Sequence, residues 1–417
     1  MRWVFNTPGL KNKILAVLGL VLVYKFLAVV PVPGVNTDAL QGMLESQKGL
    51  SFFSALMGWG LENFSVILMG LSPYINAMII IQLLGVIIPK LEQLQKEGEQ
   101  GQKKMTQMTR YLTLPLAILQ SYGMIILLNS LAGGSIIDTT NTATVLTAMM
   151  MITTGTIFLM WLGEIMTEKG IGNGISIIIT AWVLAWVPGV INKYIAAGNY
   201  GLFAWLLAAT LFVIYVIIKF TEGNRRIPVI YSKTGRDEKS YFPIKINQAG
   251  MVPIIFAISL VTFPWIIGQI LTSQTGERAQ QIGNILVQYF NMQNPSWTFI
   301  ILYFLLVLGF SFFYVSITFN TENVAENIQK RWGYIPGIRP GSETAEYLSK
   351  VSAHLNLFGW SFLALIAVLP YIMGKVTGQT IDFIITGAGL IIIVSVVLDI
   401  IRKVDSEMKM FDYSKFK

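Results

Sequence analysis

The sequence predicts an all-α protein that crosses a membrane about ten times, and three observations support this prediction. Of the 417 residues, 54% are hydrophobic and only 12% are charged, whereas about 25% of the residues in a soluble domain are charged. The apolar residues fall into blocks of about 20, the length that a helix needs to cross about 30 Å of hydrocarbon. Lys and Arg collect in alternate connections between these blocks.

Ten apolar blocks are candidate spans. They are residues 14–33, 64–88, 107–131, 143–163, 171–191, 201–220, 249–271, 297–319, 355–373 and 380–401. The first block follows a short basic start, as the apolar core of a signal peptide does, but it is too long for such a core. It also ends in Pro31 and Pro33 and lacks a small-residue cleavage site. We therefore expect it to be retained as the first span.

The distribution of positive charge predicts the orientation. Lys and Arg number 25 on the side that holds both termini and only 4 on the other side. Positive residues stay on the cytoplasmic side of a membrane, so both termini are expected in the cytoplasm of a cell with the chain in its inner (plasma) membrane. Lys25 lies inside the first span. Its long stem either reaches for the membrane interface or presents a functional charge, and the former is the commoner behaviour.

One apolar segment does not fit the pattern of spans. Residues 50–61 form a block of 12 residues, broken by Gly58 and Gly60. As a helix it would be about 18 Å long, too short to cross the hydrocarbon. The segment precedes the second span on the non-cytoplasmic side, so a short interfacial or re-entrant helix is expected there.

The inventory of reactive groups argues against an enzyme. The chain has no cysteine and one histidine, His354, which excludes thiolate metal sites and most histidine-based catalysis. Glu164, Asp382 and Asp399 lie near the ends of spans, where solvated or snorkelling roles are expected. An ion-coupled transporter usually carries acidic residues near the midplane, and none is seen. With no phosphate-binding loop, we expect no cofactor, and any energy must come from a partner.

Two long basic loops, 219–247 and 320–354, have features beyond an orientation signal. Basic loops beside a membrane often only set topology and contact lipid headgroups, and this explanation is as good as docking for the first loop. In the second loop Pro336, Gly337, Pro340 and Gly341 bracket Arg339. Such a rigid frame around one arginine suits recognition of a carboxylate or phosphate.

Six dispersed stretches resemble the SecY family, the channel subunit of the bacterial or plastid Sec protein translocon. They are VPVPG at 30–34, GLSPYINAMIIIQLL at 70–84, QKKMTQMTRYLTLPLAILQ at 102–120, TEKGIGNGISIIIT at 167–180, INQAGMVPIIFA at 246–257 and YIPGIRPGSETAEYL at 334–348. They occur in the order typical of the family. The resemblance implies two inverted five-helix halves, 1–200 and 201–417, around a central pore. It also implies that the short segment at 51–61 is a plug.

The resemblance further implies a constriction ring of aliphatic side chains. Its members are Leu71, Ile75, Ile175, Ile179, Ile255 and Ile392. Leu71 and Ile75, like Ile175 and Ile179, are four residues apart and so share a helix face. An apolar ring excludes ions by dewetting and has no charge to retain a passing chain. Without the resemblance, the same residues would be expected to face lipid.

Further roles follow from the resemblance. Asn76 and Gln82 in the second span are candidates to line a lateral gate between spans 2 and 3 and spans 7 and 8, although interhelical hydrogen bonds explain them equally well. Arg225, Arg226 and Arg339 are candidate docking residues for the SecA motor or the ribosome. The loop tip KTGRDEK is shorter and less arginine-rich than is usual in the family.

These implications together describe a channel for unfolded secretory proteins that also releases membrane proteins sideways into lipid. The expected partners are the small subunits SecE and SecG, signal peptides, unfolded substrate chains and membrane lipids. The alternative is a secondary transporter of a small solute, which would need a binding site near the membrane midplane.

Overall fold

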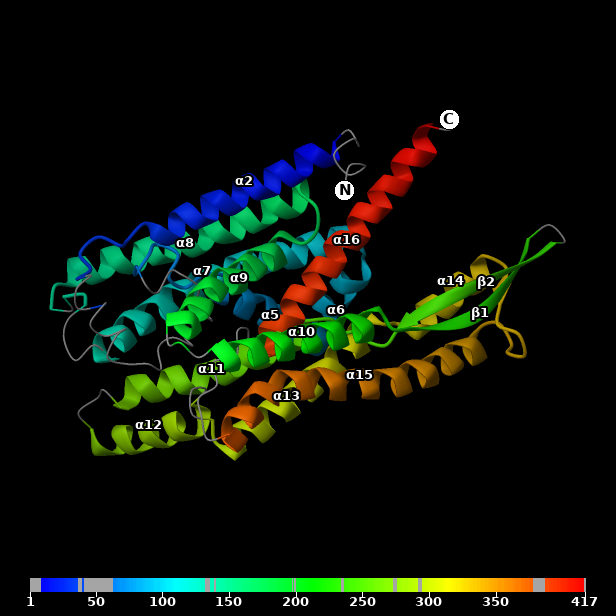
Figure 1. The fold of residues 1–417 in the computed structure, drawn as a ribbon. Coiled ribbons are helices and arrows are strands. Elements are labelled where there is room, and N and C mark those ends of the chain that lie inside the picture. Colours follow the sequence, from blue (N-terminus) through cyan, green and yellow to red (C-terminus); the bar gives the residue numbers. More distant parts are fainter. Residues whose placement is uncertain are drawn as a thin grey trace. The chain divides into compact units, whose positions relative to one another are not determined.

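The computed structural model describes residues 9–36, 40, 63–131, 136–138, 140–196, 198, 200–233, 236–272, 276–291, 295–377 and 387–415 (Figure 1). The chain forms two compact units. The first unit contains residues 1–204, 259–299 and 395–417, and the second contains 205–258 and 300–394. Each unit is described by itself.

The prediction of an all-α membrane protein is confirmed, but the number of spans is not. Within the described residues, eight helices are long and apolar enough to cross a membrane, or nine if the bent pair α5 and α6 counts as one span. The tenth predicted span, 380–401, begins outside the described residues. Its helix, α16 (Gly387–Lys415), continues into the basic tail soon after Asp399.

The first unit is built around four long helices. They are α2 (Leu10–Val29), α7 (Glu99–Leu131), α8 (Thr142–Lys169) and α9 (Gly174–Ala196). In Figure 1, α2 runs beside α8, and α8 also contacts α7 and α9. Glycines permit the close approaches. A Cβ on Gly155 of α8 would overlap the carbonyl oxygen of Val66, and one on Gly163 would lie 3.1 Å from Cγ1 of Ile175.

An apolar core fills one end of the first unit. There the chain after α2 pairs with two later segments, through bonds from Val32 N to Phe64 O (3.0 Å) and from Asn36 N to Ile136 O (2.9 Å). The Asn129 side chain accepts hydrogen bonds from the amides of residues 136 and 137 and so joins the end of α7 to these residues. The core residues include Val32, Leu40, Phe64, Leu68, Met69, Ile125, Ile137, Ile152 and Trp265.

The predicted span 64–88 is wrong as a continuous helix. Residues 63–71 form turns, and α5 (Ser72–Ile87) has only 16 residues. Gly70 adopts φ +53°, and Pro73 follows in the first turn of α5, where a helix tolerates proline. At the other end Ile88 is extended, as a residue before proline prefers. The chain there bends by 108° into α6 (Pro89–Lys96).

A helical hairpin also belongs to the first unit. The second half of α11 (Val252–Thr272) packs against α12 (Glu277–Phe290), which lies in the connection between the predicted spans 249–271 and 297–319. The start of α13 (Trp297–Thr318) also belongs to this unit.

The second unit joins its helices to a small sheet. Besides most of α13, its elements are α10 (Tyr200–Glu222), β1 (Asn224–Lys233), β2 (Arg236–Lys245), α14 (Thr321–Lys330), β3 (Gly333–Tyr334), α15 (Ser342–Thr377) and the first part of α16. The antiparallel sheet has the order β2-β1-β3. Tyr231 lies opposite Gly333 and Ile230 opposite Tyr334, so the sheet links the loop at 219–247 to the loop at 320–354.

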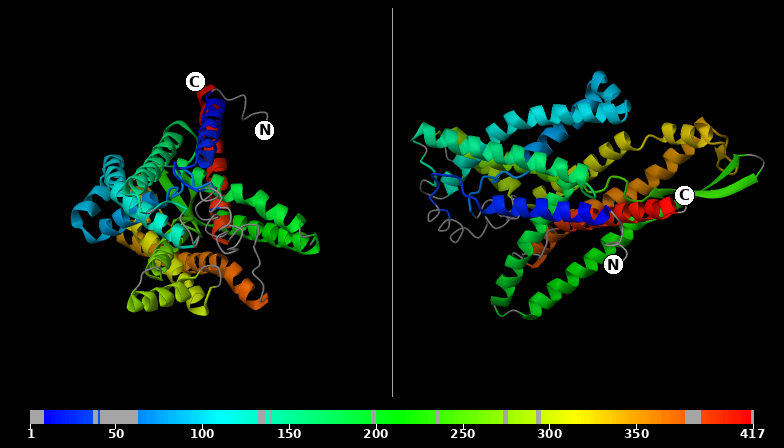
Figure 2. Two further views of the ribbon diagram at one scale, coloured as in Figure 1. Left: turned by 90° about the vertical axis from the view of Figure 1, so that its left-hand side faces the viewer. Right: turned by 90° about the horizontal axis from the view of Figure 1, so that it is seen from above.

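A second apolar core holds these loops together. Ile227 and Val229 of β1 project from the same face of the strand, because side chains alternate along a strand. They pack with Ile244 of β2 against α14 and the start of α15. Figure 2 shows the ribbon of the strand pair beside these helices. The other buried members are Ala325, Ile328, Ile335, Ala345 and Leu348. The helix α15 begins 13 residues before the predicted span at 355 because its first turns cover this core.

Candidate pore and docking sites

The first pair of candidate ring residues lies at the start of α5. Leu71 is the N-cap residue, and the Ile75 amide donates a hydrogen bond to its carbonyl oxygen at 2.9 Å. The two residues are therefore one helical turn apart on the same face. Their exposed fractions are 0% and 7%.

The second pair lies in the first turns of α9. The Asn173 side chain accepts a hydrogen bond from the Ile175 amide at 3.1 Å and so fixes the start of the helix. Ile175 is half-buried, with one side against Gly163 of α8, and Ile179 is 8% exposed.

A single contact joins the start of α5 to α9. The residue before Leu71 is Gly70, and a Cβ at this position would overlap the indole ring of Trp182. Trp182 lies three residues after Ile179, on the next turn of α9. The fold therefore brings the start of α5 into direct contact with the third turn of α9 within the first unit.

The remaining ring candidates belong to the second unit. Ile255 is half-buried in the first turn of α11, while its neighbours Ile254 and Phe256 are both fully buried. Ile392 of α16 is 6% exposed. Because these residues and the first four lie in different units, closure of the six-residue ring stays a prediction.

The two gate candidates occupy different faces of α5. Asn76 is 5% exposed, and Gln82 is half-buried. A separation of six residues places them about 120° apart around a helix, so one narrow seam cannot contain both. Gln120 of α7 was not predicted as a gate candidate, but its amide nitrogen and oxygen are buried without a hydrogen-bond partner among the described residues. The sequence signal that could have identified this residue is a glutamine within the apolar stretch LPLAILQSYG.

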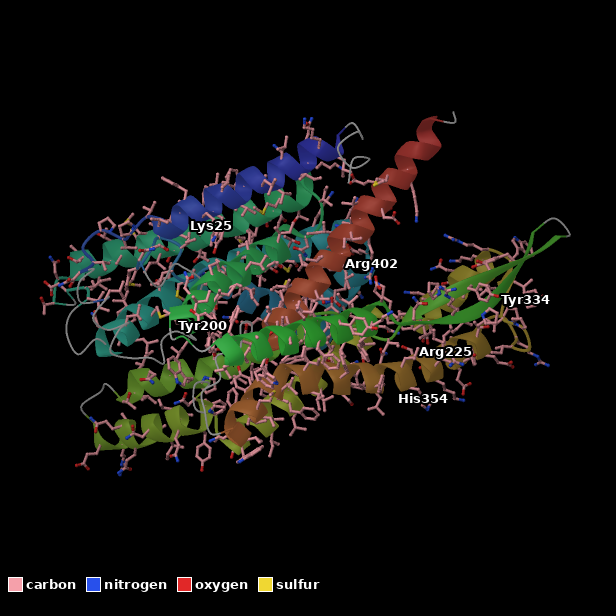
Figure 3. All side chains as sticks on the ribbon, viewed as in Figure 1. Lys25, Tyr200, Arg225, Tyr334, His354 and Arg402 are labelled. Carbon is pink, nitrogen blue, oxygen red and sulfur yellow. The ribbon has the colours of Figure 1, made fainter. Side chains whose placement is uncertain are left out.

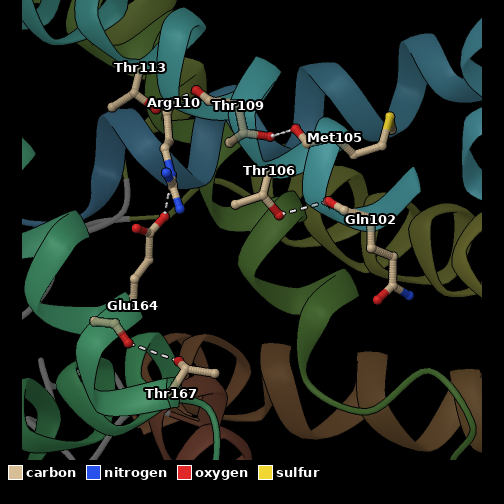
Figure 4. Close-up of polar contacts among 9 residues, drawn as sticks. Gln102, Met105, Thr106, Thr109, Arg110, Thr113, Glu164 and Thr167 are labelled. Carbon is tan, nitrogen blue, oxygen red and sulfur yellow. Dashed lines mark hydrogen bonds and ion pairs between the residues drawn. The ribbon is translucent and has the colours of Figure 1, made fainter. Parts of the chain in front are cut away.

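An ion pair joins α7 to α8. Arg110 Nε lies 2.7 Å from Glu164 Oε1, with side-chain exposures of 46% and 21% (Figure 4). Glu164 was expected to be solvated or snorkelling; its side chain is partly exposed and has a specific partner in Arg110. Around Arg110, the hydroxyls of Thr106, Thr109 and Thr113 donate to carbonyl oxygens four residues earlier.

The candidate docking residues all lie on the part of the second unit that contains the sheet. Arg225 and Arg226 begin β1 and are exposed, and Figure 3 shows Arg225 near the start of the hairpin. They are consecutive strand residues, so their side chains leave opposite faces.

Arg339 combines a fixed backbone with an exposed head group. Gly337 and Gly341 have φ +82° and +106°, which glycine adopts most readily. The Thr344 hydroxyl donates to the Arg339 carbonyl oxygen at 2.8 Å, which anchors the frame to α15. The Arg339 side chain is 87% exposed, with Glu343 at 3.9 Å.

Lys25 and His354 were also singled out in the sequence, and both are labelled in Figure 3. Lys25 is half-buried on α2. His354 is exposed on α15, with Nδ1 2.7 Å from the Lys350 carbonyl oxygen. No group of three or more potential metal ligands occurs in the described part of the chain. Asp382 and the segment 51–61, expected to be a plug, lie outside the described residues.

These features define a multi-pass α-helical membrane protein with aliphatic pairs, mostly buried, in the first turns of two helices and a structured pair of basic loops. Comparison with known proteins identifies the group. The chain belongs to the SecY family, whose family model matches residues 65–401.

Relatives and solved structures agree with this assignment. The protein translocase subunit SecY of Corynebacterium glutamicum is 38% identical over 98% of this chain and 97% of its own length. The protein translocase subunit SecY of Streptomyces galbus is 36% identical over 99% of this chain and 98% of its own length. The fold is similar to a SecY structure concerned with the plug domain and the closed translocation channel, with TM-score 0.69 and 18% identity over 95% and 92% of the two chains. It is also similar to Sec61 in a canine ribosome–channel complex, with TM-score 0.60 and 17% identity over 95% and 92%. The alternative of a secondary transporter receives no support.

Proposed function

We propose that the chain is a passive protein-conducting channel that passes unfolded secretory proteins across a membrane and releases apolar segments sideways into lipid. The structural observation that supports the channel best is the contact between Gly70 and Trp182. It joins the start of α5 to the third turn of α9, and each of these helices carries an aliphatic pair on one face, of which Leu71, Ile75 and Ile179 are buried and Ile175 is half-buried. Full-length similarity to protein translocase subunits supports the same function.

The proposed constriction works through its lack of charge. Leu71, Ile75, Ile175 and Ile179 from the first unit, with Ile255 and Ile392 from the second, form the ring. A narrow apolar ring resists wetting and therefore ions, whereas flexible aliphatic side chains adapt to polypeptides of different width. Segment 51–61 closes the channel from the non-cytoplasmic side. The chain itself performs no covalent chemistry.

Sideways release follows from lipid thermodynamics. A segment of about 20 apolar residues is more stable in hydrocarbon than in an aqueous pore. The proposed gate opens between the two halves, 1–200 and 201–417, with Asn76 and Gln82 on the α5 side. Because these two residues lie on different faces of the helix, only one of them lines the gate seam at a time.

The proposed orientation places both termini and both basic loops in the cytoplasm, with the chain in the inner membrane. The 25-to-4 bias of Lys and Arg supports it. Arg339, Arg225 and Arg226 then face the partner that delivers the substrate, a motor ATPase such as SecA or the ribosome. Two of the similar structures are channels bound to ribosomes. SecE and SecG are the proposed small subunits.

Reconstitution tests the function directly. The full chain with its small subunits is placed in liposomes with a motor ATPase, ATP and a urea-unfolded secretory precursor. We expect full-length precursor to become protected from external protease only when the chain is present. Accumulation of a radiolabelled small solute without any protected precursor would contradict the channel and favour a transporter.

A further inference from the structure

The short helix α12 has three distinct faces. Gly283 is buried and faces α11. A second face exposes large apolar side chains: Ile282, Ile285 and Tyr289 are 53%, 54% and 46% exposed. A third face is exposed and polar, and its members are Glu277, Gln281, Asn284 and Gln288. At 100° per residue these three sets form separate stripes around the helix.

The packing of α12 on α11 is close and depends on two glycines. A Cβ on Gly268 would lie 2.8 Å from Cβ of Leu286, and a Cβ on Gly283 would lie 2.7 Å from the amide nitrogen of Thr272. Figure 1 shows the two helices side by side. The orientation of α12 relative to the end of α11 is therefore fixed, and so is the direction in which its apolar stripe points.

The position of α12 in the chain places it at a membrane surface. It lies between the end of one candidate span, at Thr272, and the start of another, at Trp297. Both adjoining spans expose apolar side chains near these ends, with Ile267 at 48% and Trp297 at 56%. The exposed stripe on α12 thus continues a surface that already faces lipid.

The composition of the stripe fits a lipid interface. Arg278 is exposed on the same side of the helix as Ile282 and Ile285. On amphipathic helices at a membrane surface, the aliphatic and aromatic groups of one side reach the acyl boundary while a basic side chain on that side extends to the phosphates. Tyrosine and tryptophan are enriched at this level of the membrane.

We infer that α12 is an interfacial anchor, with Ile282, Ile285 and Tyr289 inserted into the boundary between headgroups and acyl chains. The lipid contact does not depend on the proposed function, but its assignment to the non-cytoplasmic leaflet rests on the proposed topology. The anchor fixes the outer end of α11, one of the helices of the proposed lateral gate.

The absence of cysteine from the sequence allows a direct test. Single variants Ile282→Cys and Ile285→Cys, with Asn284→Cys and Gln288→Cys as controls on the polar face, are spin-labelled in the full chain. The labelled chains are reconstituted in vesicles of phosphatidylethanolamine and phosphatidylglycerol. Power-saturation EPR then compares collisions with O₂, which partitions into lipid, and with a water-soluble nickel chelate.

The expected result is an O₂-to-nickel accessibility ratio several-fold higher at residues 282 and 285 than at 284 and 288. Equal, water-like ratios at all four positions would overturn the inference. Dipolar broadening between labels at residue 285 would identify a second copy of the chain as the occupant and would also overturn it. All four side chains are exposed, so each variant should elute with the unlabelled chain in size-exclusion chromatography.

The leaflet is tested separately. In intact cells, Asn284→Cys should react with a membrane-impermeant maleimide added from outside. Reaction only after the cells are opened would overturn the assignment to the outer leaflet and the proposed topology together. The EPR ratios would still decide the lipid contact, and the precursor assay would still decide the channel.

Discussion

Gly70 packs against the indole ring of Trp182 so closely that no side chain fits at position 70. The contact connects the turn before α5 to the third turn of α9. Gly70 also has φ +53°, a conformation that β-carbon-bearing residues rarely adopt. Two helices whose sequences are separated by about a hundred residues are thereby fixed at the ends where the proposed pore residues lie.

Gly70→Ala should destabilise the protein for two reasons. The left-handed backbone costs alanine about 1–2 kcal/mol, and overpacking against Trp182 costs about 1–3 kcal/mol more. We expect a clear fall in the unfolding temperature of the purified chain in detergent. Gly189→Ala is the control, because a Cβ at this α9 position meets nothing within 4 Å. It should be neutral or slightly stabilising, and equal behaviour of the two variants would contradict the Gly70–Trp182 contact.

The ion pair between Arg110 and Glu164 should show measurable coupling. Both side chains are partly exposed, so we expect an interaction energy of only about 0.5–1 kcal/mol. A double-mutant cycle with Arg110→Gln and Glu164→Gln measures it through chemical unfolding. The surface pair Glu326–Lys330, one turn apart on α14, is the control and should give about 0.3–0.5 kcal/mol. An interaction energy of zero between Arg110 and Glu164 would show that this ion pair does not join α7 to α8.

Arg339→Glu should weaken partner-driven translocation without affecting membrane insertion of the protein. The arginine head is exposed on an anchored backbone, so the fold does not depend on its side chain. Losing a charge-assisted contact costs about 1.5–3 kcal/mol, or roughly 10- to 100-fold in docking affinity. Motor-dependent protection of a precursor provides the measurement. Lys350→Glu, the same charge reversal at another exposed side chain of α15, should have little effect, and normal translocation by Arg339→Glu would refute the docking role.

Gly333→Val should detach β3 from β1. A Cβ at Gly333 would lie 2.7 Å from Cε1 of Tyr231 and 2.9 Å from Cγ2 of Ile328, so a branched side chain forces the strands apart at a cost of about 1–3 kcal/mol. Hydrogen–deuterium exchange should become faster in peptides covering 224–233 and 333–334. Gly309→Ala, with open space around residue 309, should leave both peptides unchanged. Unaltered protection in Gly333→Val would show that the two loops are not linked through this sheet.

The lengths of the apolar blocks in the sequence predicted the fold class well, because the thickness of the hydrocarbon layer determines how many apolar residues a membrane-spanning helix needs. The start of α5 was predicted too early, at residue 64. The apolar residues at 64–71 are compatible with turns buried in an apolar core as well as with a helix. The β hairpin formed by β1 and β2 was not predicted, although the sequence contains a signal for it. Ile227, Val229 and Tyr231 occur at every second position, as apolar residues on one face of a strand do. The same holds for α12, whose residues 282, 285, 286 and 289 have helical spacing.

The relationships among the candidate site residues are harder to predict, because they depend on contacts distant in sequence. Arg110 and Glu164 are 54 residues apart, and no periodicity relates them. The i,i+4 spacing of Leu71 and Ile75 places both on one face but does not say what that face meets. Only the family resemblance predicted that this face lines a pore and does not contact lipid. The Gly70–Trp182 contact could not be predicted from the sequence of either segment alone.

Site-specific crosslinking of a stalled precursor tests the channel most directly. Because the chain has no native cysteine, Ile75→Cys and Ile179→Cys each present one reactive thiol to a precursor carrying its own cysteine. Leu119→Cys and Phe212→Cys, at side chains that are 68% and 67% exposed on α7 and α10, are controls that face lipid. We expect disulfide crosslinks at residues 75 and 179 and none at 119 or 212. Crosslinks confined to the lipid-facing controls would contradict a pore lined by the α5 and α9 aliphatic pairs.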